Sequence, residues 1–101
     1  MVLEAIELAL TDTGYLVVPE PVARAVFPND VLTTIVRDGM LWLYPMRGPG
    51  GGGLLLKRRN AAGDRCVLLT EVLLEIGSTL SAGPLHATWD ARHAALRIAL
   101  P

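Results

Sequence analysis

Cysteine is almost absent from this sequence, since Cys66 is the only one among 101 residues. A single cysteine excludes a disulfide within the chain and a cysteine-based metal cluster built by one chain. Long apolar runs are absent as well, because none approaches the roughly 18 residues that a membrane-spanning helix needs. The first ten residues, MVLEAIELAL, carry Glu4 and Glu7 where a signal peptide carries cations. We therefore expect a cytoplasmic protein.

An excess of charge of one sign is also missing. Nine Lys and Arg residues stand against ten Asp and Glu residues, which gives a net charge of −1. No overall field therefore attracts the chain to nucleic acid or to an anionic membrane. Hydrophobic residues make up 51% of the sequence and charged residues 19%, a composition that favours a folded domain over a disordered one. A small domain this apolar often covers part of its surface with a partner or a second copy.

The apolar pattern predicts a mostly β fold, either β-barrel-like or of swapped-hairpin type, in a single domain over residues 1–101. We divide this domain into a swapped-hairpin-like half (1–47), a glycine-rich loop (48–53) and two further hairpins (54–101). Three such hairpins leave strand edges that need cover, so we also expect a homodimer.

Two stretches of the first half support this prediction. Residues 5–19 show a period of two on both sides of the polar turn TDTG, which predicts two strands. The spacing of Glu4 and Glu7 leaves a helix over residues 2–10 as the rival interpretation. Residues 31–45 place Asp38-Gly39 between two β-rich runs, and this dipeptide is typical of a type I′ hairpin turn.

One short helix is expected over residues 20–27, EPVARAVF. Pro21 suits the first turn of a helix, and Pro28 ends it. The pattern of a second segment, residues 70–76, is equally compatible with a strand and with a helix that ends at Gly77.

The second half predicts two hairpins and a loop. One hairpin joins residues 54–58 to residues 65–69 around Ala62-Gly63. The other spans residues 86–100 and bends near Ala91-Arg92. Residues 77–85 have the composition of a loop.

Five of the ten glycines lie within Gly48–Gly53, directly before the triplet LLL. A phosphate-binding loop of the Walker type needs Gly-Lys-Ser/Thr at the start of a helix, so that backbone N–H groups converge on the phosphates. Here a β-rich run follows, and no Ser or Thr comes after Lys57. We expect a mobile connector that binds no phosphate.

Four cations gather just beyond this loop: Lys57, Arg58, Arg59 and Arg65. One interpretation is a solvated hairpin tip in which Asp64 pairs with an arginine, an exposed pair of little energetic value. The other is a partner-binding prong that contacts phosphate or an acidic protein surface. Aromatic residues do not alternate with the cations as single-strand nucleic-acid binders require.

Catalytic chemistry finds little support in the sequence. His86 and His93 flank a predicted bend with Asp90, but no further ligand recurs at a spacing that supports a metal site. Cys66 on a strand is typical of a small buried hydrophobe. We predict a protein without catalytic residues, metal or cofactor. Trp42 and Tyr44 share one strand face, and we expect them to pack in the core or at a dimer interface.

Residues 14–45 resemble the swapped-hairpin domain of AbrB/MazE-type regulators. Val18-Pro19, a short helix, the corner Asn29-Asp30 and the turn Asp38-Gly39 follow the family's order of elements. The resemblance implies a DNA-binding regulator or antitoxin. The family carries a cation directly after its first turn glycine, where this chain has Tyr15, and residues 1–36 hold one cation against five carboxylates.

Residues 50–100 resemble small uncharacterised proteins encoded beside nickel–iron hydrogenase genes. This resemblance implies an accessory role with a protein partner and transfers no catalytic residues. Because the net charge is near zero and the first third is acidic, we favour a non-enzymatic domain that binds a protein, and expect no membrane contact. DNA binding is the alternative.

Overall fold

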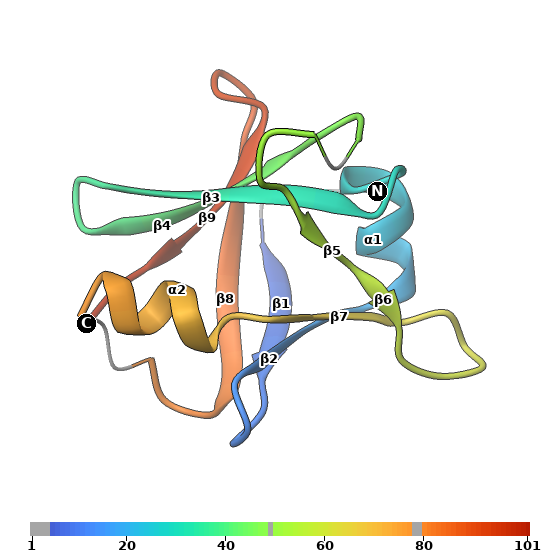
Figure 1. Ribbon diagram of the computed structural model, residues 1–101, viewed down its shortest axis with the longest axis horizontal. Helices are drawn as coiled ribbons and strands as arrows, with labels where there is room; N and C mark the ends of the chain where they lie inside the picture. Colours follow the sequence, from blue (N-terminus) through green and yellow to red (C-terminus); the bar gives the residue numbers. More distant parts are fainter. Residues whose placement is uncertain (1–4, 49, 78–79) are drawn as a thin grey trace.

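The computed structural model describes residues 5–48, 50–77 and 80–101, and it shows a mostly β fold with two short helices (Figure 1). All nine strands belong to one antiparallel sheet in the order β5-β3-β4-β9-β8-β1-β2-β7-β6. The strands are β1 (Ile6–Leu10), β2 (Tyr15–Val18), β3 (Val31–Arg37), β4 (Met40–Pro45), β5 (Leu54–Leu55), β6 (Lys57–Arg58), β7 (Arg65–Leu68), β8 (Gly83–Asp90) and β9 (Ala95–Ala99). The helices are α1 (Glu20–Val26) and α2 (Thr70–Glu75).

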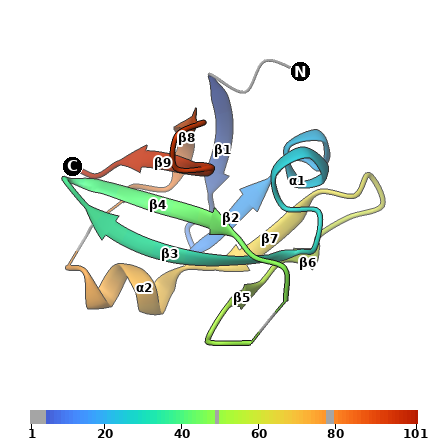
Figure 2. The same ribbon diagram turned by 90° about the horizontal axis from the view of Figure 1, so that it is seen from above.

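The sheet curls into a nearly closed barrel (Figures 1 and 2). Its two terminal strands, β5 and β6, are consecutive in the chain, so the two ends of the sheet lie close together. β5 pairs with β3, β6 pairs with β7, and Leu56 lies between them. The backbone N–H of Leu56 donates to the carbonyl of Asp30 at 2.8 Å, and its side chain is buried. One segment therefore joins both ends of the sheet.

This closure corrects the expected hairpin of residues 54–58 with residues 65–69. Lys57 and Arg58 pair with β7 as expected, but Leu54 and Leu55 pair with β3 instead. The buried side chain of Leu56 faces the core at the point where the segment passes from one neighbour to the other.

Inward-facing residues of the strands fill the barrel with aliphatic side chains. β1 shows the alternation that the sequence predicted, with Ile6, Leu8 and Leu10 buried and Glu7 exposed. Helix α1 adds Val22 and Val26 to the same core, next to the fully buried Phe27. Burial of this apolar area is the main favourable term in folding.

The first half of the chain has the predicted elements. β1 and β2 flank the turn TDTG, and α1 occupies Glu20–Val26 within the expected range. Asp38 and Gly39 have φ values of 55° and 71°, the two left-handed conformations of a type I′ turn. The rival helix over residues 2–10 is wrong for Ile6–Leu10, which form a strand, while residues 1–4 lie outside the described part.

Two expectations for the second half are resolved or corrected. The ambiguous residues 70–76 form helix α2 over Thr70–Glu75. The loop expected over residues 77–85 ends earlier, because β8 already begins at Gly83, where it pairs with Leu10 of β1. Residues 78–79 of that expected loop lie outside the described residues. The last hairpin turns through residues 91–94, one position later than its expected centre.

Among the described residues, neither helix has the length and apolar character to cross a membrane.

Candidate partner-binding surface

The four cations singled out in the sequence lie around the turn between β6 and β7, which we call the cationic turn (residues 57–65). Lys57 and Arg58 form β6, Arg59 enters the turn, and Arg65 begins β7. The backbone N–H of Arg59 donates to the carbonyl of Asp64 at 2.7 Å and closes the turn. Lys57, Arg58 and Arg59 are exposed, whereas Arg65 is half-buried.

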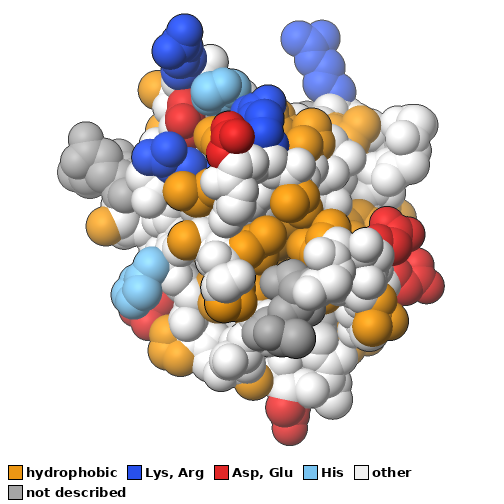
Figure 3. All heavy atoms as spheres, turned by 90° about the vertical axis from the view of Figure 1, so that its left-hand side faces the viewer, with side chains coloured by type: hydrophobic (Ala, Val, Ile, Leu, Met, Phe, Trp, Pro, Cys, Tyr) orange, Lys and Arg blue, Asp and Glu red, His pale blue; other side chains and the backbone are white. Residues whose placement is uncertain are grey.

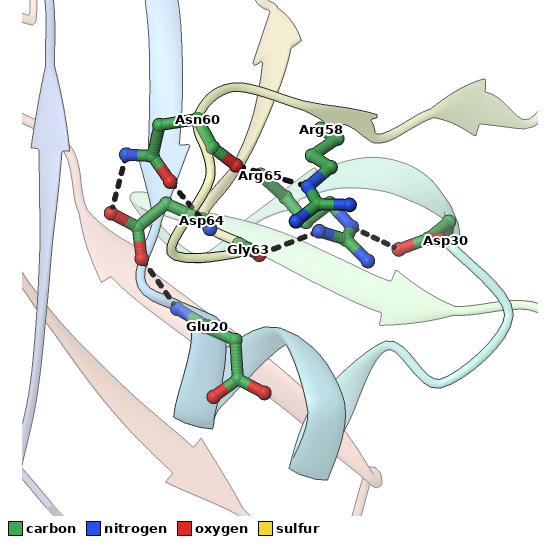
Figure 4. Close-up of polar contacts among 7 residues, drawn as sticks. All are labelled: Glu20, Asp30, Arg58, Asn60, Gly63, Asp64 and Arg65. Atoms are coloured by element: carbon green, nitrogen blue, oxygen red, sulfur yellow. Dashed lines mark hydrogen bonds and ion pairs between the residues drawn. The ribbon is translucent and has the colours of Figure 1, made fainter.

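Arg58 folds back over its own turn (Figure 4). Its Nε donates to the carbonyl of Asn60 at 3.0 Å, and its Nη2 donates to the carbonyl of Ala61 at 3.0 Å. Hydrogen bonds from a charged donor are stronger than neutral ones, so they hold the side chain in place. Arg58 therefore presents a positioned positive charge at the surface.

Asp64 fastens the cationic turn to helix α1 (Figure 4). Its Oδ2 accepts from the Nδ2 of Asn60 at 2.9 Å, and its Oδ1 accepts from the backbone N–H of Glu20 at 2.9 Å. These two bonds, with a smaller attraction from Arg59, lower the pKa of Asp64 below its ordinary value, Asn60 contributing most. The bond to Glu20 also satisfies one of the free N–H groups at the start of α1. The sequence had suggested an arginine as the partner of Asp64.

Arg65 reaches toward the segment between α1 and β3. Its Nε contacts the Oδ1 of Asp30 at 3.0 Å, and its Nη1 donates to the carbonyl of Gly63. Its side chain is 25% exposed. Asp30 has a φ of 55°, a conformation that Asp tolerates better than most residues. Arg65 thus braces the fold, whereas Lys57, Arg58 and Arg59 remain exposed. Because Arg58 pairs with Arg65, these two share one face of the sheet and Lys57 lies on the other.

A small cavity lies between α1 and the cationic turn, with a volume of about 220 Å³. Its lining includes two ion pairs, Arg65 with Asp30 and Arg24 with Glu20, the latter at 3.0 Å. Because these charged side chains pair with one another, we interpret the cavity as part of the packing between the helix and the turn and not as a ligand site.

An apolar hollow of about 360 Å³ adjoins the cationic turn. Tyr15, Leu55 and Leu68 are exposed beside it, by 39%, 52% and 46%, and Lys57 lines its edge. Tyr15 and Leu68 lie opposite each other on β2 and β7, on the outer face of the sheet. These residues could not be predicted from the sequence, since the alternation of β2 shows that Tyr15 lies on the face opposite Leu16 but not which strand pairs with β2.

Trp42 and Tyr44 stack on the outer face of β4, with ring centroids 6.2 Å apart. The guanidinium carbon of Arg37 lies 4.9 Å from the Trp42 ring centroid, and the ring of His93 is also 4.9 Å away. The indole Nε1 donates to the carbonyl of Arg37 at 3.3 Å. Trp42 is therefore covered by its own chain, and Tyr44 is the more accessible ring of the pair.

The histidines considered for a metal site do not form one with Asp90 within the described residues. His86 pairs with Glu7 of β1 in the middle of β8. His93 lies in the following turn, where its backbone N–H donates to Asp90 Oδ1 at 3.0 Å and its Nδ1 lies 3.1 Å from the same atom. The backbone bond is the main cause that lowers the pKa of Asp90.

Comparison with protein-family models, with curated proteins and with solved structures finds no match to this chain.

Proposed function

We propose that this protein is a small non-enzymatic accessory domain that acts by binding a protein partner. The observation that carries the proposal is the apolar hollow beside Tyr15 and Leu68, which has Lys57 in its lining and the exposed Arg59 two residues further along the same segment. Protein interfaces commonly combine an apolar, aromatic-containing centre with a charged rim. This surface has both parts within one region of the barrel.

The charge of the cationic turn favours an acidic partner surface. The segment from residue 57 to residue 65 holds four of the nine cations and one acidic residue. Such a concentration steers an oppositely charged partner even though the whole chain carries a net charge of −1. The resemblance of residues 50–100 to hydrogenase-associated proteins makes a hydrogenase component in the cytoplasm the first partner to test.

A homodimer is part of the proposal. Ile35 is 44% exposed and lies beside Trp42 on the outer face of the β3–β4 hairpin, next to the accessible Tyr44. A contact between two such faces would cover Ile35 and Tyr44 and would lie against the edge of Trp42. We assign Trp42 and Tyr44 to this interface, with Tyr44 making most of the contact.

Capture of binding proteins from the native cell tests the proposal, with three versions of the domain as bait. The double variant K57S/R59S removes two cations that have no side-chain hydrogen bond within the described structure. The control R47S/R92S removes two exposed arginines elsewhere on the surface. We expect a protein retained by the wild type and the control but depleted by K57S/R59S. Equal retention by all three would remove the cationic turn from the proposal.

DNA binding, the alternative implied by the AbrB/MazE resemblance, draws on the same exposed cations. A DNA-binding protein that neutralises several phosphates loses affinity steeply as salt rises. Retention of random duplex DNA at low salt, lost at higher salt and lost in K57S/R59S, would place this alternative above a protein partner.

A further inference from the structure

Beyond Leu32, β3 is paired on one side only within the described residues. Its whole length from Leu32 to Arg37 pairs with β4. On the other side, β5 pairs with Val31 and Leu32 and then ends. Residues 33–37 therefore leave one long edge of the strand open, and an open edge offers backbone donors and acceptors to another strand.

Thr34 and Val36 direct their backbone groups to this open edge. In an antiparallel ladder, alternate residues bond to the same neighbour. The N–H of Met46 donates to the carbonyl of Val31 at 3.0 Å, so the odd-numbered residues of β3 face the β4 side. The N–H and C=O groups of Thr34 and Val36 consequently point to the free side. Their spacing of two residues matches the repeat that an added strand needs.

A groove of about 400 Å³ lies between this edge and helix α2. Figures 1 and 2 both show α2 beside the part of β3 that extends beyond β5. Thr34 lines the strand side, while Leu54, Leu68 and Val72 supply apolar lining. Seen from the side where the β3–β4 turn projects, hydrophobic side chains are exposed across the middle of the surface (Figure 3).

The charge lining the groove is acidic. Glu71 and Glu75 lie one helical turn apart on α2, and both line the groove. Like charges at this spacing repel each other. The described lining contains no Lys or Arg, so a positive charge on an occupant would be attracted to both carboxylates.

We propose that the open edge of β3 and the groove beside α2 bind an extended segment of a protein partner, which adds to the sheet as a further strand. Backbone bonds to Thr34 and Val36 hold the segment, as in other cases of strand addition. Its alternate side chains enter the apolar groove, and a Lys or Arg next to them meets Glu71 and Glu75. This inference goes beyond the proposed function, because the surface and the charge of its ligand differ from those of the cationic turn.

A peptide of matching chemistry tests the proposal directly. The probe is an acetylated six-residue peptide that alternates valine and lysine, and its control alternates valine and glutamate. We expect the lysine peptide to bind and the glutamate peptide to bind at least about tenfold more weakly at low salt. Equal binding of the two peptides, or binding of neither, would overturn the proposal.

Hydrogen exchange measured by NMR on the wild-type protein locates the binding. Without peptide, we expect the amides of Thr34 and Val36 to exchange faster than that of Ile35, which is bonded to β4. With the lysine peptide, both should become protected. Unchanged exchange at these two amides during binding would overturn strand addition.

Substitution of Val36 by proline removes a donor that faces the open side and leaves the bonds to β4 intact. V36T is the matched control because it keeps the N–H group. We expect V36P to weaken peptide binding by about fivefold or more, as the loss of one hydrogen bond implies. Unchanged peptide affinity in a folded V36P would contradict the proposal.

E71K/E75K provides a test that leaves the strand untouched. It should weaken binding of the lysine peptide and improve that of the glutamate peptide. K57S/R59S should leave both affinities unchanged, which separates this inference from the proposed function. If the wild type self-associates and V36P abolishes that association, a second copy occupies the edge and the peptide proposal fails.

Discussion

The Oδ1 atom of Asp64 accepts a hydrogen bond from the backbone N–H of Glu20, 44 residues away in sequence, at 2.9 Å. This bond continues the pairing of β2 with β7, which ends at Val18 and Arg65, and fastens the cationic turn to the first residue of α1.

The pH dependence of stability is the first prediction from this contact. The pKa of Asp64 is lowered in the folded protein, so its ionised carboxylate stabilises the fold. This stabilisation is complete above the ordinary carboxylate pKa of about 4. The contribution is lost as the pH falls through the lowered folded value. D64N should therefore show a weaker loss of thermal stability between about pH 4 and pH 2 than the wild type.

Asn60 is the largest cause of the lowered pKa, which supplies a matched test. N60A should raise the pKa of Asp64 toward its ordinary value, measured by NMR titration of the carboxyl carbon. In the D64N background, N60A should change the acid profile little more, because Asn60 affects this titration through its hydrogen bond to the carboxylate that D64N removes. A profile identical in wild type and D64N would contradict this assignment.

The second prediction separates the two kinds of arginine in the cationic turn. R65S removes the contacts with Asp30 and Gly63 and should lower the melting temperature by about 4 °C or more. R59S makes the same chemical change at an exposed position, so its unfolding free energy should change by less than about 0.5 kcal/mol. Thermal unfolding by circular dichroism compares them, and an equal loss in both would disprove the bracing role of Arg65.

The third prediction concerns Gly53. A Cβ atom at this position would lie 2.6 Å from Cγ1 of Val31 and 3.2 Å from Sδ of Met46. G53A should destabilise the protein by about 1–3 kcal/mol in urea unfolding, the range for overpacking a tight site. V31A should recover part of that loss in the double variant. G50A is the control, since a Cβ at Gly50 meets nothing within 4 Å. If G50A and G53A behave alike, the close approach to Val31 does not decide the choice of glycine.

The fourth prediction concerns the outer aromatic pair and the proposed homodimer. Y44S should shift a dimer toward monomer in light scattering at micromolar concentration, with little change in unfolding free energy. W42A should instead lower the unfolding free energy by about 3 kcal/mol, because Trp42 is buried against its own chain. A wild-type monomer at that concentration would refute the dimer.

Local patterns in the sequence were sufficient for the elements whose reasons are local. The Asp38-Gly39 turn follows from the φ angles that these two residues tolerate, and α1 follows from Pro21 near its start and Pro28 beyond its end. Alternation likewise identified the strand faces of β1, because successive side chains of any strand point to opposite sides.

The same alternation carries no information on which strand becomes the neighbour. Leu54 and Leu55 pair with β3 and not with β7, because the barrel closes through Leu56. For the same reason, the open edge at Thr34 and Val36 cannot be seen in the sequence of β3.

The sequence shows how many charged residues the chain has, but it does not show which residues they pair with. Lys57, Arg58, Arg59 and Arg65 form one group by composition, and the fold divides them. Arg65 lies beside Asp30, 35 residues away, so its charge serves the fold. The other three remain exposed, and of these Lys57 lines the apolar hollow. Composition and local conformational preference thus determined the elements and the class of fold, whereas the long-range pairing of strands decided which side chains reach the surface together.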